Sequence, residues 1–352
     1  MSAPVRVDVS TLSPGGPVGA AHVPPAQTPG DSGLHAAPAG VPGGSGTHIP
    51  LTRARANLIL LFVALVWGSA FVAQAFGMRS LGPFLFTGLR FALGAAIVAP
   101  FAWREWRMLA ARRRAPRPRD ALHIAALGTL LFLGAAMQQI GMMTTTVTNA
   151  GFLTALYIPV VPVVAWVLFR QLPHWTAWLA ALGCLVGTWL LTGGAPGDGL
   201  PSLRAGDWWV IASALPWALH VVLVGRAANR LQGAMIVASG QFAMCSILAL
   251  LTAVAIEPVA WAGIRAALGA IAYTGVLSVG IGFTLQVVAQ RHAHAADSAI
   301  VLSSETVFAA TFGAIFMGDR LGAAAAAGCA LILACILMVQ LQPVVRPWLK
   351  QR

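Results

Sequence analysis

The sequence predicts an all-α polytopic membrane protein, with ten transmembrane helices that form two inverted repeats of five helices each. Three observations predict this fold class. Hydrophobic residues make up 58% of the 352 residues. Charged residues make up only 9%, against roughly a quarter in a soluble domain. Long apolar segments recur along the chain, and the second half of the series repeats features of the first.

The chain begins with a segment that cannot form a packed core. Residues 1–55 are rich in Pro, Gly, Ala and Ser and show no apolar periodicity. They also lack a basic start followed by an apolar stretch, so we expect no cleaved signal peptide. The sequence predicts a disordered cytoplasmic tail over residues 1–55 and a short basic cytoplasmic tail over residues 343–352.

Between these tails lie ten apolar segments. A helix that spans a bilayer needs about 20 predominantly apolar residues, and each segment meets or approaches that length. Only Thr144, Thr145 and Thr146 separate the third segment from the fourth, and only Gly318, Asp319 and Arg320 separate the ninth from the tenth. The predicted spans are residues 57–76, 83–103, 121–142, 147–169, 174–193, 208–227, 234–256, 267–289, 298–317 and 322–342.

The basic residues indicate how these helices are oriented. With both termini in the cytoplasm, seventeen of the 22 Lys and Arg residues fall on the inside and four on the outside, and Arg90 falls within the membrane. This bias predicts cytoplasmic termini. It also accounts for the net charge of +12, so we expect the lipid bilayer and no nucleic acid as the partner of these residues.

The two halves of the series match in sequence. Trp67 of the first helix corresponds to Trp217 of the sixth, and Gln138 of the third corresponds to Gln286 of the eighth. A repeat of five helices enters the membrane with the opposite orientation in its second copy. The sequence therefore predicts repeats over residues 56–193 and 207–342, related as in secondary transporters that bind substrate near the repeat interface.

Several motifs resemble those of one family. These are LVWGSAF in the first helix, GLRFALGA in the second, QQIGMMTTTVTNAGFLTALYIPVVP across the third and fourth, and LQVVAQRHAHAADSAIVLSSETVFAATFGAIFMGDRL across the eighth and ninth. Over about residues 56–342 the chain resembles the EamA-type family of the drug/metabolite transporter superfamily. The resemblance implies export or exchange of small metabolites, such as amino acids, related solutes or drugs, across the bacterial inner membrane without ATP hydrolysis. The chain departs from the family pattern at 169–172, where Phe-Arg-Gln-Leu replaces a Gly-Glu-Arg-Leu-like turn.

Glu305 is the main candidate for a functional side chain. It lies alone among apolar and small residues in the ninth span, where a charged group costs about 2.5 to 3.5 kcal/mol. We expect it to bind substrate or a proton, and the alternative is a protonated carboxyl group hydrogen-bonded to a neighbouring helix. Gln241 and His220 are predicted at a similar depth and could share its pocket as hydrogen-bond partners. The alternative for His220 is a neutral imidazole bonded to a helix carbonyl.

Arg90 is predicted roughly 10 Å in from the opposite face, with Gln138 and Tyr157 among its neighbours by depth. About 10 Å of depth would separate it from Glu305, so we expect no direct ion pair. Contact with an anion or a gating role is the preferred interpretation, and a side chain that reaches the outer surface is the alternative. Trp67 and Trp217 are predicted near mid-membrane, where they could line the cavity or form packed core.

The sequence predicts a secondary carrier, and two other classes of function compete with it. An intramembrane enzyme lacks support, because the chain shows no paired acids, no metal-ligand cluster and no Walker motif. A scaffold or sensor has only the long tail in its favour. We expect no catalytic residue, metal or cofactor. Proton coupling is a hypothesis, and a homodimer is left open.

Overall fold

The computed structural model describes residues 53–170, 175–191, 204–290, 295–320 and 322–349. Every regular element in these ranges is a helix, which confirms the all-α prediction. Almost all of the predicted tail over residues 1–55 lies outside the described residues.

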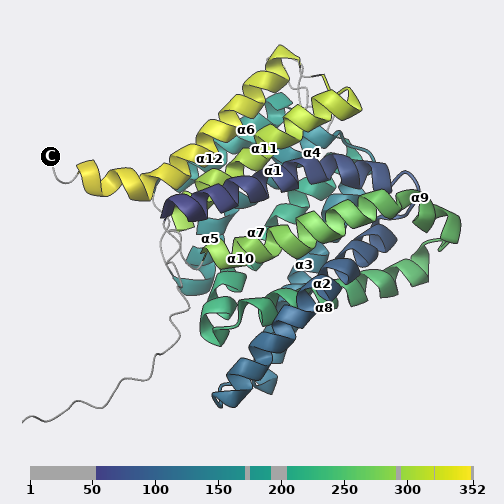
Figure 1. Cartoon of the computed structure of the whole chain (residues 1–352). Coiled ribbons are helices and arrows are strands. Elements are labelled where there is room, and N and C mark those ends of the chain that lie inside the picture. The colour runs from purple at the N-terminus through teal and green to yellow at the C-terminus, as the bar shows by residue number, and fades with distance from the viewer. Residues whose placement is uncertain (1–52, 171–174, 192–203, 291–294, 321, 350–352) are drawn as a thin grey trace, which may run out of the picture. The chain divides into compact units, whose positions relative to one another are not determined.

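The helices follow the predicted apolar segments closely, and Figure 1 shows their arrangement. In chain order they are α1 (Arg53–Gly77), α2 (Pro83–Ala111), α3 (Pro118–Met142), α4 (Val147–Thr154), α5 (Tyr157–Phe169), α6 (Trp175–Leu191), α7 (Ala205–Leu231), α8 (Ala234–Ile256), α9 (Trp261–Ala272), the π-helix η1 (Tyr273–Phe283), α10 (Thr284–Gln290), α11 (Ala295–Met317) and α12 (Ala323–Leu349).

Two of the predicted continuous helices are subdivided. The fourth segment breaks between Thr154 and Tyr157, just before Pro159, whose ring cannot fit the preceding turn and whose nitrogen donates no hydrogen bond. The eighth segment changes from α9 to the π-helix η1 and back to α10. Both irregular places border the cavity described below.

Seven helical stretches are long and apolar enough to cross a membrane, by length and composition, among the residues that the structure describes. Three shorter apolar helices fall in the fifth, ninth and tenth predicted spans. This pattern is that of a multi-pass membrane protein. The seven long stretches are Leu58–Gly77, Pro83–Ala111, Pro118–Met142, Val147–Phe169, Ala205–Ala228, Ala234–Ile256 and Trp261–Ala289.

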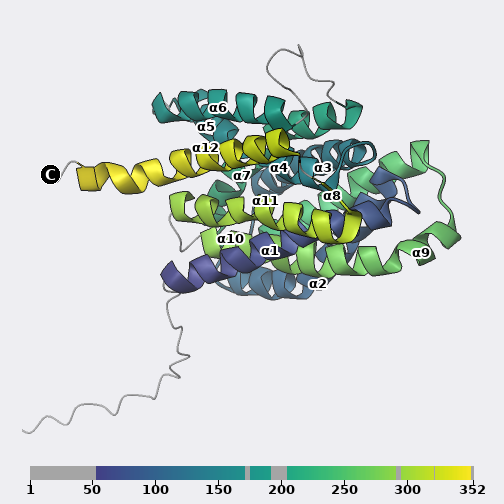
Figure 2. The same ribbon diagram turned by 90° about the horizontal axis from the view of Figure 1, so that it is seen from above.

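Helices from the two halves of the chain pack against each other. The main pairs are α1 with α11, α2 with α8, α3 with α7 and α6 with α12, and α4 also contacts α11. Figure 2 shows α6 and α12 on one side and α1, α2 and α9 on the other, with α7 and α11 between them. The pairing of α1 with α11 and of α3 with α7 brings polar residues of both halves toward one centre.

Carboxylates at helix ends fix several of these pairs. Glu257, directly after α8, accepts hydrogen bonds of 2.8 Å from the backbone N–H groups of Phe84 and Leu85 in the first turn of α2. Glu105, near the end of α2, accepts one of 2.9 Å from the N–H of Ile236 in the first turn of α8. Free N–H groups and the helix dipole favour a negative charge at such positions. These carboxylates therefore hold the antiparallel α2–α8 pair in register.

Asp319 makes a similar contact after α11. Its carboxylate accepts hydrogen bonds of 2.9 and 2.8 Å from the backbone N–H and the hydroxyl of Thr148, in the first turn of α4. Glu105, Glu257 and Asp319 are thus engaged at helix ends, whereas Glu305 lies in the middle of α11.

Candidate functional site

Residues from both halves of the chain line one cavity, which we call the central cavity. Helices α1 to α5 contribute from the first half, and α7, η1, α10 and α11 contribute from the second. Its wall combines aromatic rings with polar side chains. The lining residues are Trp67, Phe71, Gln74, Arg90, Phe91, Gln138, Thr154, Tyr157, Trp217, His220, Val221, Ser278, Phe283, Gln286 and Glu305.

Arg90 of α2 supplies a buried positive charge to this cavity. Its side chain is 4% exposed, and its guanidinium donates a hydrogen bond of 2.6 Å to the amide oxygen of Gln74. Among the described residues no carboxylate lies within ion-pair distance of it, and its Nε has no partner. The alternative in which Arg90 reaches the outer surface is therefore wrong, because the side chain is enclosed between helices.

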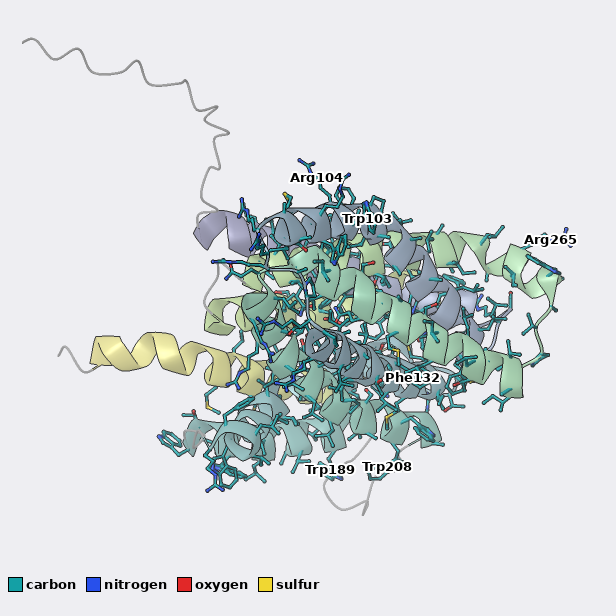
Figure 3. All side chains as sticks on the ribbon, turned by 90° about the horizontal axis from the view of Figure 1, so that it is seen from below. Trp103, Arg104, Phe132, Trp189, Trp208 and Arg265 are labelled. Carbon is teal, nitrogen blue, oxygen red and sulfur yellow. The ribbon has the colours of Figure 1, made fainter. Side chains whose placement is uncertain are left out.

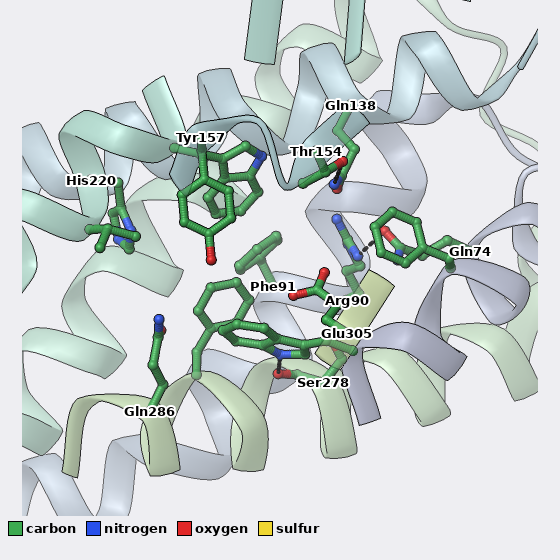
Figure 4. Close-up of a pocket in the computed structure, with 15 residues that line it drawn as sticks. Gln74, Arg90, Phe91, Gln138, Thr154, Tyr157, His220, Ser278, Gln286 and Glu305 are labelled. Atoms are coloured by element: carbon green, nitrogen blue, oxygen red, sulfur yellow. Dashed lines mark hydrogen bonds between the residues drawn. The ribbon is translucent and has the colours of Figure 1, made fainter. Parts of the chain in front are cut away.

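Glu305 of α11 supplies an acidic side chain to the same cavity. Figure 4 shows its carboxylate and the guanidinium of Arg90 directed into the same space, with the hydroxyl of Tyr157 directed inward from α5. Within the described part of the chain, neither an ion pair to Arg90 nor another hydrogen bond engages this carboxylate. Although the sequence placed the two residues at different depths, both line one cavity and both retain bonding capacity for a ligand.

Polar groups gather at both ends of the cavity. Near Arg90, the amide of Gln138 donates a hydrogen bond of 2.8 Å to the hydroxyl of Thr154. Figure 4 shows His220 and Gln286 at the other end. The repeat-related pair Gln138 and Gln286 therefore faces the cavity from α3 and α10.

Gln241 does not reach the cavity wall as the sequence suggested. It is fully buried on α8, and its amide oxygen accepts a hydrogen bond of 2.8 Å from Nε2 of His220. The expectation that Gln241, His220 and Glu305 share one pocket is correct only for the last two. Gln241 lies behind His220 and fixes the orientation of its ring.

The aromatic part of the wall is organised around Phe283. Its ring centroid lies 4.6 Å from that of Trp67 and 6.1 Å from that of Trp217, which is stacked on it at 13°. The ring of Phe91 lies 6.2 Å away. Trp67 and Trp217 thus line the cavity together, and Phe283, which sequence reasoning missed, joins them.

The π-helix η1 positions this aromatic group. The indole N–H of Trp67 donates a hydrogen bond of 3.2 Å to the backbone carbonyl of Ser278, inside η1. A Cβ atom at Gly282 would lie 2.7 Å from the indole nitrogen, so this glycine gives the ring its space. Segments of π-helix occur frequently at functional sites. The sequence signal for η1 is limited to the small residues Gly275, Gly280 and Gly282, which do not by themselves predict a π-helix.

Gly68 sets the distance between α1 and α11. A Cβ atom there would lie 2.8 Å from the backbone oxygen of Glu305 and 2.9 Å from the nitrogen of Ala309. We expect Gly68→Ala to separate the two helices, displace Glu305 and lower transport at least about tenfold, because packed helices cannot absorb the added methyl without a shift. Gly269→Ala is the control, since nothing lies within 4 Å of its added Cβ. Initial flux and melting temperature are measured for both variants. Unchanged flux in Gly68→Ala would contradict this packing argument.

Comparisons with known proteins agree with the architecture. The model of the EamA-like transporter family matches the chain twice, over residues 54–193 and 204–341. An uncharacterized transporter of Archaeoglobus fulgidus is 27% identical over 294 residues, which cover 82% of this chain and 87% of that protein. A crystal structure of a protein with 21% identity superposes with a TM-score of 0.60, over 83% of this chain and 98% of that one. The structural likeness shows the fold alone.

Proposed function

The chain belongs to the EamA-like transporter family and is a multi-pass membrane transporter, and from this premise we propose that it is a secondary carrier for small zwitterionic metabolites of the amino-acid type. The observation that carries the proposal is that a basic and an acidic side chain, Arg90 and Glu305, line one cavity and do not form an ion pair with each other. A substrate carboxylate would bind Arg90, and a substrate ammonium group would bind Glu305.

The rest of the cavity fits the same class of substrate. Phe283, Trp67 and Trp217 offer an apolar surface for a side chain of the substrate. Gln138 and Gln286 offer both donors and acceptors. An apolar cavity with a few convergent polar groups is the usual form of a small-molecule site.

A single carboxylate that binds either a proton or the ammonium group of the substrate would couple proton movement to substrate movement. Each occupant excludes the other from Glu305, so a proton that enters from one side would replace a substrate released there. The carrier would then exchange protons for substrate and would use a proton gradient for export. This arrangement needs no ATP hydrolysis and no cofactor.

We also propose the ten-span inverted repeat, with repeats over residues 56–193 and 207–342, both termini in the cytoplasm and an inner-membrane location. The helix pairs support it, because α2 and α8 hold the same rank in their repeats, as do α6 and α12. The two matches to the family model have nearly the same bounds as these two repeats. A two-fold relation about the central cavity would allow it to open alternately to each side.

The test uses purified protein in liposomes loaded with unlabelled substrate. We expect saturable exchange of labelled L-phenylalanine, and at least about tenfold weaker exchange of phenylalaninamide, which lacks the carboxylate, and of phenylpropionate, which lacks the ammonium group. Further amino acids with smaller side chains extend the panel. If no zwitterion is exchanged above the level of empty liposomes, the proposal fails.

The same experiment separates the carrier from its two competitors. A scaffold or sensor would show no saturable flux of any substrate. An intramembrane enzyme would return a chemically changed compound, which mass spectrometry of the recovered label would detect.

A further inference from the structure

A second cavity lies away from the central one, on helices α3, α5 and α7. It shares no lining residue with the central cavity. It lies at the ends of these helices that the distribution of Arg and Lys assigns to the cytoplasmic side. Its lining residues are Asp120, His123, Ala126, Leu127, Phe169, Leu223, Arg226, Ala227, Arg230 and Leu231.

The side chains that line this second cavity, which we call the groove, change from polar to apolar along its depth. On α3, Asp120 and His123 lie in the first turns, and Leu127 follows one turn deeper. On α7, Arg226 and Arg230 lie toward the end of the helix, and Leu223 lies one turn deeper. The groove therefore has a polar rim at the membrane surface and an apolar floor that enters the bilayer.

The rim carries excess positive charge. Arg230 pairs with Asp120 at 3.4 Å, and Asp120 also accepts a hydrogen bond of 2.9 Å from the backbone N–H of Arg117. The guanidinium carbon of Arg226 lies 3.1 Å from the ring centroid of Phe169. Within the described ranges no carboxylate pairs with Arg226. Its guanidinium lies over the ring, and its charge is open to an anion.

The neighbouring end of α2 also suits the headgroup layer of the membrane. Trp103 and Trp106 are exposed by 63% and 41%, and their rings stack at 5.3 Å. Arg104 lies beside Trp103 on the outer face of this helix (Figure 3). Tryptophan concentrates at membrane interfaces, and basic segments beside a span attract anionic lipids.

We propose that this groove binds one anionic phospholipid of the cytoplasmic leaflet. The phosphodiester group contacts Arg226, with Arg230 next to it one turn further along α7. An acyl chain lies over Leu127 and Leu223. A free phosphate would use only the rim, whereas the apolar floor fits a molecule that joins an anionic head to a hydrocarbon chain. The inference rests on the membrane location of the chain and does not depend on the transported substrate.

Native mass spectrometry of the intact protein in detergent tests the site, with phosphatidylglycerol and phosphatidylcholine as probes. We expect one tightly bound phosphatidylglycerol per chain and binding of phosphatidylcholine at least about tenfold weaker. Arg226→Gln should weaken phosphatidylglycerol binding about tenfold through the loss of a charge-assisted contact. Arg265→Gln is the matched control. Arg265 is exposed on α9, and this helix does not line the groove. In Figure 3, Arg265 also lies well away from Arg104.

A second variant tests the apolar floor without a change in charge. Ala126 is exposed at the groove, so Ala126→Phe can fill it with little effect on folding, which the melting temperature checks. We expect it to weaken phosphatidylglycerol binding as well. Equal binding by wild type, Arg226→Gln and Ala126→Phe would overturn the proposal, as would equal affinity for the two lipids. Competition by glycerol 3-phosphate at the same concentration as the lipid would also overturn it, in favour of a soluble phosphate.

Discussion

Arg90→Gln is expected to lower kcat/KM for a zwitterionic substrate about a hundredfold. Arg90 uses one nitrogen for Gln74, and no carboxylate within the described part of the chain neutralises its charge. Hydrogen bonds to charged groups contribute about 1.5 to 3 kcal/mol each, and each 1.4 kcal/mol corresponds to a factor of ten. A planar guanidinium binds a carboxylate through two parallel bonds, so their joint loss gives an effect of this size. Initial exchange rates in liposomes over a range of substrate concentrations measure it.

Two controls distinguish loss of a substrate contact from loss of structure. Arg90→Lys keeps the charge and loses the paired donors, so we expect an intermediate decrease. Phenylalaninamide has no carboxylate, and its weak exchange should be the same in wild type and Arg90→Gln. If Arg90→Gln lowers exchange of the amide and of the zwitterion by the same factor, Arg90 supports the fold and does not bind the carboxylate.

The fold was largely predictable because a bilayer imposes a simple pattern on sequence. Apolar segments of spanning length place the start of α2 and both ends of α8 at their observed residues, whereas α2 continues from the predicted end at residue 103 to Ala111. Pro159 and Pro162 marked the fourth segment as a place where a helix can bend, but the full break between α4 and α5 was not predicted, because a Pro inside an apolar run can bend, break or begin a helix. The π-helix η1 was missed for a related reason, since its residues differ little from those of an α-helix in composition.

The central cavity was predictable in its polar part and in two of its aromatic rings, those of Trp67 and Trp217. A charged or amide side chain in an apolar segment stands out, so Arg90, Glu305 and Gln138 were found from sequence, and they line one cavity. Their roles in binding remain a prediction. Phe283 could not be found in this way, because an aromatic residue in an apolar segment fits lipid contact, core packing or a cavity wall equally well. Gln74, which holds Arg90, lies near the end of α1, where a polar residue is unremarkable.

A difference in predicted depth does not prevent two residues from lining one cavity. The depth estimates assumed straight helices perpendicular to the membrane, and so they separated Arg90 from Glu305 by about 10 Å. Helices tilt by about 20° on average, and long side chains extend several ångströms from the helix axis. Two residues at different heights on α2 and α11 can therefore face the same space, as Figure 4 shows for Arg90 and Glu305.

Glu305→Gln is expected to abolish the part of the flux that a pH gradient drives. Glutamine has the shape of glutamate but cannot bind and release a proton. The variant therefore has no side chain at this position that can carry a proton in exchange for substrate. The loss of the negative charge should also raise KM for a zwitterion about tenfold, through the weaker contact with its ammonium group. We expect residual exchange of L-phenylalanine at equal pH on both sides, with a rate that no longer changes when a proton gradient is applied.

The controls follow from the other groups that titrate at the cavity wall. His220 and Tyr157 also line it, so His220→Gln and Tyr157→Phe should keep the pH-driven flux if Glu305 is the coupling group. Phenylpropionate lacks the ammonium group, and its KM should be unchanged in Glu305→Gln. An equal response to the gradient in wild type and Glu305→Gln would exclude Glu305 as the proton carrier. Loss of that response in His220→Gln alone would instead assign the proton to the imidazole that Gln241 orients.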